Sequence, residues 1–346
     1  MLRSLLPLMV MVAVALVMEL VVSPGVGKFY TKIFADIAVA VVLAVSLTMV
    51  NGFTGQFSMG HAGFAAVGAY AGAGITFYGS LLLWGEYTER TGFLNAGEWL
   101  FAGSCVAGGL VAAALGYVVG LPSLRLRGDY LAIVTLGFGE IVRVLLQQTN
   151  AQMYEADEVR AAGVAQLWPP PLGGAQGFSD VPSYTNLFWA FLFAGLTMLV
   201  AYRLKQSSTG RAMLSIRENE IAAQSCGVNA TALKVRAFVI AAFFAGIAGS
   251  LMAHQTVLSP KDAGFQKSFE IIIMVVLGGL GSISGAVLAA VILTAVQFYL
   301  QEYAEYRMII YSLLLIGMML VRPQGLFGVK EVWELRRRGR RVGGGA

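Results

Sequence analysis

Long apolar runs separated by short polar links extend along the whole chain. A helix that crosses a bilayer needs about 20 mostly apolar residues, and ten runs approach that length. We predict spans at Ser4–Val22, Ile33–Val50, His61–Leu83, Trp99–Gly120, Tyr130–Gln147, Asn186–Tyr202, Ala237–Gln255, Ser268–Leu280, Ala286–Leu300 and Met308–Val321. The run at 268–280 is short, so a re-entrant or tilted helix is the alternative there. The run at 4–22 is longer than the apolar core of a signal peptide, which favours an uncleaved helix over a cleaved signal.

The composition supports a membrane protein and excludes several other classes. Of 346 residues, 57% are hydrophobic and 12% are charged, against about 25% charged residues in a typical soluble domain. A soluble chain this apolar has too few polar side chains to cover its surface, and two cysteines cannot form a disulfide framework. We therefore predict an all-α, polytopic bundle of about ten spans that forms one domain over residues 1–346 and leaves room for broken or re-entrant helices.

The distribution of Lys and Arg predicts the orientation, because cytoplasmic segments are enriched in these residues. With the N-terminus inside, the inner segments hold 16 of them and the outer loops hold 7. Both termini are therefore predicted to be cytoplasmic, with a long outer loop at 148–185 and a long inner loop at 203–236. The basic tail at 322–346 is interpreted as an anchor near anionic lipid of the bilayer rather than a nucleic-acid site, so no nucleic acid is expected as a partner.

The link after the second span is unusual because it is polar and yet carries no charge. Residues 51–64 (NGFTGQFSMGHAGF) contain no Lys, Arg, Asp or Glu. Non-helical backbone at membrane depth is tolerated only inside protein or beside a wet cavity, and transporters place broken helices near their substrates. Asn51, Gln56, Ser58 and His61 are therefore candidate residues of a translocation pathway. The alternative is a tight hairpin that packs the bundle, and for His61 a hydrogen-bonded structural role is favoured over a proton relay.

The ionisable residues within the predicted spans are assigned structural roles. They are Glu19, Asp36, Glu140, Arg143 and Glu270. Glu140 and Arg143 are three residues apart, so they share a helix face and are expected to pair. The others lie near helix ends, where they can reach the interface. Nothing in the sequence resembles a catalytic set or a metal cluster, and the G-x-x-x-x-G-K-[ST] motif of a nucleotide site is missing, so no cofactor and no enzymatic activity are predicted.

The inner loop has the signals of two short helices. The predicted features are Ser208 or Thr209 as the cap of a helix over Arg211–Ile216, Asn219 as the cap of a helix over Ile221–Cys226, and Gly227 as the residue that closes the second helix. A short helix that stands free in water is only marginally stable. This one must therefore dock, either on the protein's own membrane ends or in a cleft of a cytoplasmic partner.

Four stretches of the chain resemble the LivM type of branched-chain amino acid ABC transporter permease. They are NGFTGQFSMGHAGFAAVGAYAGA at 51–73, GRAMLSIRENEIAAQSCGVNATALKVRAFVIAAFFAGIAGSL at 210–251, MVVLGGLGSISGAVLAA at 274–290 and RPQGLFG at 322–328. Two weaker signals accompany them. Residues 221–227 resemble the EAA loop of importer permeases, with Ile221 in place of Glu, and GGAQGF at 173–178 resembles a Gly-rich outer motif of the family.

This resemblance implies a multi-pass subunit of the bacterial inner membrane that moves branched-chain amino acids. Its implied partners are a LivH-like sister permease, two cytoplasmic ATPase subunits that bind the ATP, and a periplasmic substrate-binding protein. The inner loop is then the element that couples the chain to the ATPases, with the candidate residues Gly210, Arg211, Arg217, Glu218, Asn219, Glu220, Ala222, Ala223 and Gly227. The alternatives are a urea or short-chain amide permease of the same family, an ion-coupled secondary transporter, and a membrane scaffold without transport activity.

Overall fold

The computed structural model describes residues 2–86, 94–124, 129–161, 163 and 168–301, with single positions beyond at 306, 309–310, 312–313, 316–317, 320, 325–326 and 331. The elements in chain order are α1 (Leu2–Val17), the π-helical turn η1 (Met18–Val22), α2 (Ser23–Gly25), α3 (Lys28–Asn51), α4 (His61–Trp84), α5 (Ala96–Ser123), α6 (Asp129–Gln147), α7 (Ala156–Ala161), the 3-10 turn η2 (Gly174–Gln176), α9 (Leu187–Gln206), α10 (Ser208–Glu218), α11 (Glu220–Ser225), α12 (Ala230–Ala253), the 3-10 turn η3 (Pro260–Ala263), α13 (Phe265–Gly278) and α14 (Ile283–Tyr299). Between these helices, the described residues form only two isolated β-bridges and no strand.

Seven helical stretches of the described chain are long and apolar enough to cross a membrane. They are Leu6–Gly25, Lys28–Asn51, His61–Trp84, Ala96–Ser123, Tyr130–Gln147, Leu187–Gln206 and Ala230–Ala253. These stretches confirm the first seven predicted spans and make the protein an all-α, polytopic bundle. The next two predicted spans correspond to shorter helices, α13 with 14 residues and α14 with 17 residues. Half of the predicted span at 308–321, and nearly all of the basic tail, lie outside the described residues.

The inner loop is shorter than the sequence predicts, because the flanking helices extend into it. Helix α9 continues to Gln206, and α12 begins at Ala230 rather than near residue 237. Lys234 therefore lies within α12, where its side chain is only 4% exposed and its ammonium pairs with Glu220 of α11 at 2.8 Å. A charged residue does not end a buried helix when it has such a partner, so charge alone placed the predicted boundary too late.

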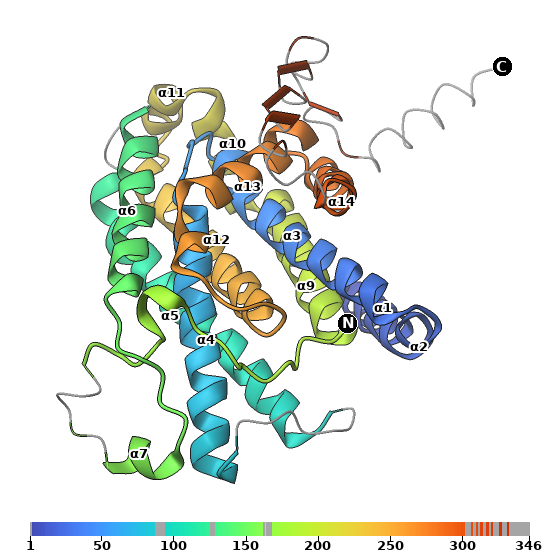
Figure 1. The fold of residues 1–346 in the computed structure, drawn as a ribbon. Coiled ribbons are helices and arrows are strands. Elements are labelled where there is room, and N and C mark those ends of the chain that lie inside the picture. Colours follow the sequence, from blue (N-terminus) through green and yellow to red (C-terminus); the bar gives the residue numbers. More distant parts are fainter. Residues whose placement is uncertain are drawn as a thin grey trace.

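Helix α12 occupies the middle of the bundle, packed against α3, α4 and α5 (Figure 1). Small residues allow these helices to approach closely. A Cβ atom at Gly68 of α4 would overlap the backbone of Gly246 in α12, and one at Gly108 of α5 would lie 2.6 Å from the carbonyl oxygen of Gly68. A Cβ atom at Gly116 would lie 2.7 Å from that of Ala242. Because apolar burial does not drive helices together within lipid, close contacts of this kind hold such a bundle together.

The first turns of α5 and α9 are joined by polar contacts. Asn95 and Asn186 cap the two helices through their side chains. The buried carboxylate of Glu98 accepts hydrogen bonds from the indole of Trp189 at 3.0 Å and from the amide of Asn186 at 3.1 Å. Glu19 of η1 also lies here, and its carboxylate accepts the backbone N–H of Phe188. Glu19 thus has the structural role that its place near a helix end indicates.

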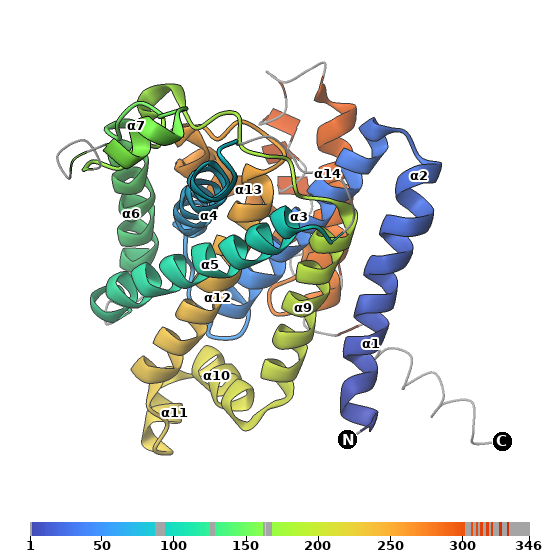
Figure 2. The ribbon, with the colours of Figure 1, turned by 90° about the horizontal axis from the view of Figure 1, so that it is seen from below.

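The two long loops lie at opposite ends of the molecule. Helices α10 and α11 form one end in both views, whereas α7 and the segment between α6 and α9 form the other (Figures 1 and 2). Helix α1 lies at the edge of the bundle beside α9 (Figure 2). The inner loop therefore forms a surface of its own at one end of the bundle, between the end of α9 and the start of α12.

Candidate functional site

The inner loop forms two short helices with well-defined caps. The side chain of Ser207 accepts the N–H of Gly210 at 3.0 Å, so α10 is capped one residue earlier than predicted, by Ser207 instead of Ser208 or Thr209. The prediction for the second helix is confirmed, because the side chain of Asn219 accepts the N–H of Ala222 at 3.0 Å. Gly227 follows α11 with a φ of +82°, a conformation that glycine adopts without steric cost.

The apolar side of these helices packs on the protein itself. Ile216 of α10 and Ala223 of α11 are buried in a small cluster with Ala230, the first residue of α12. A Cβ atom at Gly210 would overlap the carbonyl oxygen of Leu204, which explains a glycine at the turn from α9 to α10. Docking on the protein's own helix ends therefore satisfies the apolar side, and the opposite side remains free for another molecule.

The face that points away from the bundle contains most of the predicted coupling residues. Ile221 is 67% exposed, so its apolar side chain is available for contact with another molecule. Its exposed neighbours are Arg211, Glu218, Asn219, Ala222 and Gly227. Glu220 is partly buried by its ion pair with Lys234. We call this surface the α10–α11 face.

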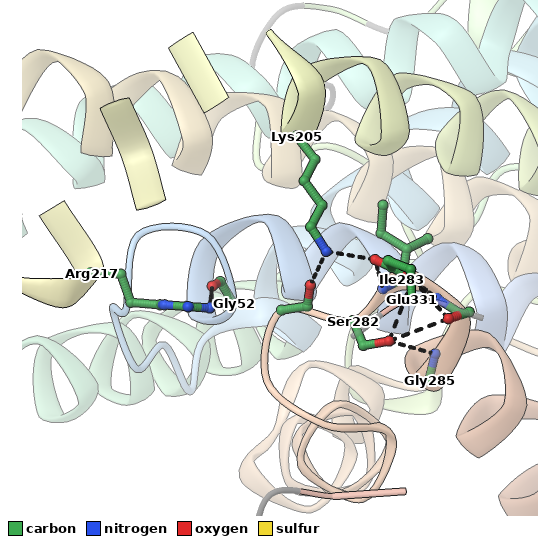
Figure 3. Close-up of polar contacts among 9 residues, drawn as sticks. Gly52, Lys205, Arg217, Ser282, Ile283, Gly285 and Glu331 are labelled. Carbon is green, nitrogen blue, oxygen red and sulfur yellow. Dashed lines mark hydrogen bonds and ion pairs between the residues drawn. The ribbon is translucent and has the colours of Figure 1, made fainter. Parts of the chain in front are cut away.

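Arg217 connects α10 to two loops that lie deeper in the molecule. Its guanidinium donates to the carbonyl oxygen of Gly52 at 2.9 Å and pairs with the carboxylate of Glu218 at 2.7 Å. A Cβ atom at Gly281 would lie 2.7 Å from the same guanidinium, and one at Gly52 would lie 2.6 Å from the backbone of Gly281. The loop after α3 and the loop between α13 and α14 therefore touch through glycine backbone, with Arg217 beside both (Figure 3).

Lys205 and Glu331 complete this contact. The ammonium of Lys205 donates to the carbonyl oxygen of Gly281 at 2.7 Å and to the carboxylate of Glu331 at 2.6 Å. Glu331 also accepts the N–H groups of Ile283 and Ser284 at 3.0 and 3.1 Å, at the first turn of α14 (Figure 3). We call this cluster the loop junction. Its members are Gly52, Lys205, Arg217, Gly281, Ile283, Ser284 and Glu331.

The loop junction holds Glu331 in its charged form. Burial alone raises the pKa of this carboxyl, but the hydrogen bonds from Lys205, Ile283 and Ser284 outweigh burial and hold the pKa below its usual range. A carboxylate at a helix N-terminus is also favoured by the helix dipole. Sequence reasoning missed both Lys205 and Glu331, because their partners are distant in the chain.

The four candidate pathway residues lie in or beside the non-helical segment 52–60, and all four are buried. His61 has a hydrogen bond of 2.8 Å to the hydroxyl of Ser46, the kind of structural contact that was favoured for it. The side-chain oxygen of Asn51 accepts the N–H of Ser58 at 3.3 Å. The amide nitrogen of Asn51, the amide oxygen of Gln56 and the hydroxyl of Ser58 have no hydrogen-bond partner among the described residues.

Two other predicted structural residues are brought together in a way that the sequence did not indicate. Glu140 and Arg143 pair at 2.6 Å as predicted. Asp36 and Glu270, in contrast, line the same cavity of about 470 Å³ together with Lys32 and Lys267. We call it the charged cavity. The sequence signal for this grouping was the spacing within each Lys–carboxylate pair, which is four residues on α3 and three on α13.

Within the described chain, no group of three or more His, Cys, Asp or Glu is arranged to hold a metal ion.

Comparisons with known proteins all lead to permeases for branched-chain amino acids. The family described as "Branched-chain amino acid transport system / permease component" matches residues 29–321. The chain is 36% identical to the high-affinity branched-chain amino acid transport permease LivM of Salmonella typhimurium over 341 residues, which cover 92% of this chain and 74% of the relative. It is 37% identical to LivM of Escherichia coli over 308 residues, covering 83% and 67%. LivH of Escherichia coli is 25% identical over 84% of this chain and 91% of its own length. No solved structure matches the chain.

Proposed function

Because the chain belongs to the branched-chain amino acid transport permease family, we propose that it is the membrane-spanning permease subunit of an ABC importer for branched-chain amino acids. The observation that carries this proposal is the match over most of the chain to relatives of that name. The protein is a multi-pass membrane protein and a transport component rather than an enzyme. In the proposed machine it has no nucleotide site of its own, and ATP is bound and hydrolysed by separate subunits.

The proposal includes four kinds of partner and a location. The chain pairs with a LivH-like permease, binds two cytoplasmic ATPase subunits, and receives its substrate from a periplasmic binding protein. The similarity to LivH over 84% of the chain supports a sister subunit of related architecture. The complex lies in the bacterial inner membrane, and the chain crosses it about ten times. The distribution of Lys and Arg supports termini on the cytoplasmic side.

The α10–α11 face is proposed as the docking site of the ATPase. Its exposed Ile221 and its charged neighbours suit a partner that covers an apolar centre with a polar rim. When ATP hydrolysis moves the ATPase, the force reaches α10, and Arg217 passes it to the loops at Gly52 and Gly281. These loops end α3 and begin α14, so both helices respond to one displacement. The candidates Asn51, Gln56, Ser58 and His61 are proposed as the inner part of the pathway beside the same loops.

Reconstitution tests this function directly. The chain, its sister permease and the ATPase subunits are placed in liposomes, and the uptake of labelled leucine is measured with the binding protein and ATP supplied on their respective sides. We expect uptake that requires every component and that is insensitive to uncouplers. Accumulation of leucine by the isolated chain, or uptake that an uncoupler abolishes, would contradict the proposal and indicate ion-coupled transport.

A further inference from the structure

The charged cavity lies between α3, α13 and α14 and is closed on one side by the segment that follows α12. Its volume of about 470 Å³ falls within the range of about 300–1,000 Å³ that is typical of pockets for small molecules. Its lining residues extend from Lys32 to Leu43 on α3, from Lys267 to Met274 on α13 and from Thr294 to Phe298 on α14. The loop junction lies beyond this range, at Gly52 after α3 and at the loop between α13 and α14.

Charges of both signs surround the mouth of the cavity. Lys32 and Asp36 lie one turn apart on α3, and Lys267 and Glu270 lie on the first turns of α13. The ammonium of Lys267 is 3.3 Å from the carboxylate of Glu270. Asp36 interacts electrostatically with both lysines, so the two pairs belong to one network across the cavity. A third carboxylate, that of Asp262, also lines the cavity, so two cations and three anions offer a ligand partners for both signs of charge.

Deeper in the cavity the lining becomes apolar. Leu43 follows Asp36 by about two turns on α3, and Met274 follows Glu270 by about one turn on α13. One polar atom lies among them. The hydroxyl oxygen of Thr294 on α14 is buried and has no hydrogen-bond partner within the described part of the chain. The cavity is thus amphipathic, with a charged mouth, an apolar floor and one unused hydroxyl group.

We propose that the charged cavity is a binding site for the transported amino acid in its zwitterionic form. The ammonium group of the ligand lies near Asp36 and Glu270, its carboxylate near Lys32 and Lys267, and its aliphatic side chain against Leu43 and Met274. This assignment rests on the proposed function for the identity of the solute, and it adds that the permease itself reads both charges of the solute. Urea carries no charged group, so it forms no ion pair with these residues, and it lacks the aliphatic part.

A purely structural role for the four charges has a different consequence. If the two pairs only neutralise each other within the bundle, removal of one member changes the stability and assembly of the complex. Any change in solute binding is then the same for every solute. A binding role requires instead that the effect depend on which charge the solute carries. The test therefore compares solutes as well as variants.

The experiment measures protection of a cysteine in the cavity of the assembled complex in nanodiscs, without binding protein. Gln297→Cys, which lines the cavity one turn from Thr294, is introduced with Cys226→Ser and labelled with a charged thiol reagent. Leucine is expected to slow the labelling about tenfold. Leucinamide, which lacks the carboxylate, isocaproate, which lacks the ammonium, and urea are expected not to slow it. Asp157→Cys in the same background is the control, because this exposed position on α7 does not line the cavity, and leucine should leave its labelling unchanged.

Charge variants then assign the groups. Asp36→Asn and Lys32→Gln are expected to weaken protection by leucine about tenfold or more, because each removes a charge-assisted contact. Lys28→Gln is the matched control. Lys28 lies one turn before Lys32 on α3 and carries the same charge, but it does not line the cavity. Absence of protection by leucine, or equal protection by leucine, leucinamide and urea, would overturn the proposal. Leucine uptake by the unmodified complex is measured separately in liposomes, so failure of the proposed function is recognised by itself.

Discussion

The loop junction and the charged cavity both gather charges from segments that are distant in the sequence, but they use them differently. In the loop junction, Glu331 accepts four hydrogen bonds of 3.1 Å or less from Lys205, Ile283 and Ser284. In the charged cavity, the ion pair of Lys267 and Glu270 has a longer distance of 3.3 Å and lies beside open volume. One cluster is filled by protein groups, whereas the other has room for a ligand.

This difference indicates what each cluster does when the molecule moves. Groups that are fully partnered and buried hold the backbone in place, because leaving one of them unpaired is costly. The loop junction is therefore suited to transmit a displacement of α10 without changing its own contacts. Charges that border a cavity can exchange one partner for another at little cost. They are suited to receive a solute and release it again.

The largest effect is expected from removing the carboxylate at the loop junction. Glu331→Ala removes the anion that pairs with Lys205, whose ammonium retains the carbonyl oxygen of Gly281, and it leaves two N–H groups of α14 without their acceptor. Breaking a buried ion pair in this way costs about 3–5 kcal/mol, which we expect to appear as a large fall in the thermal unfolding midpoint of the complex. Glu140→Ala is the control, because the pair of Glu140 and Arg143 has side chains 37% and 31% exposed and contributes about 0–1 kcal/mol. Equal falls for the two variants would contradict the comparison.

Acid should reduce the contribution of Glu331 to the stability of the folded protein. The pKa of Glu331 is lowered in the folded protein relative to its model-peptide value of 4.5, so its stabilisation is fully present above that value. It is lost as the pH falls through the lowered pKa. We therefore expect the difference in unfolding midpoint between the unmodified chain and Glu331→Gln to stay constant from about pH 8 to about pH 6 and to narrow below about pH 4.5. A difference that narrows already near neutral pH would show that the carboxyl is not held in its charged form.

These contacts mark the boundary of what the sequence could predict. The seven long helices, the Asn219 cap and the pair of Glu140 and Arg143 depend on residues within about 20 positions of each other, where periodicity and spacing determine the contacts. Glu331 and Ile283 are 48 positions apart. Tertiary packing determines that Glu331 contacts the first turn of α14, and no local sequence pattern predicts this contact.

The charged cavity was missed for the same reason, although part of its signal was present. Within each helix, the spacing of Lys32 and Asp36, or of Lys267 and Glu270, places a cation and an anion on one face. The sequence does not state that these two faces meet. The interpretation that Asp36 and Glu270 reach the membrane interface agrees with the position of each residue near the end of its helix. It overlooks that the fold brings α3 and α13 together at one cavity.

A smaller effect is expected from cutting the link between α10 and the loops. Arg217→Gln removes a charge-assisted hydrogen bond to Gly52, worth about 1.5–3 kcal/mol, so the displacement of α10 is no longer passed on. We expect the ATPase activity of the complex to remain and the amount of leucine moved per ATP to fall about tenfold. Arg160→Gln is the matched control, because the exposed Arg160 of α7 donates to the carbonyl oxygen of Leu82 at the opposite end of the molecule. Uptake that stays coupled to hydrolysis in Arg217→Gln would exclude this path.

The turn after α11 should be more tolerant still. Gly227 has a φ of +82° and open space around it, so Gly227→Ala costs only backbone strain of about 1–2 kcal/mol. We expect weaker binding of the ATPase subunit, measured by co-purification, with little change in the unfolding midpoint. Gly227→Asn should recover most of the loss, since Asn adopts this conformation more readily. A loss that is equal for Ala and Asn would point to the size of the side chain at the interface and away from the backbone.

The smallest effect on stability is expected at Ser58, which lies in the non-helical segment 52–60 between α3 and α4. The hydroxyl of Ser58 is buried without a hydrogen-bond partner among the residues described, so Ser58→Ala breaks no hydrogen bond and should change stability by less than about 1 kcal/mol. If the segment 52–60 opens to water as the loops move, Ser58→Cys in a Cys226→Ser background should react with a charged thiol reagent while ATP is hydrolysed, and slowly without ATP. A cysteine there that never reacts would mean that this segment only packs the bundle. The route from the charged cavity would then have to pass along other residues of α3 and α13.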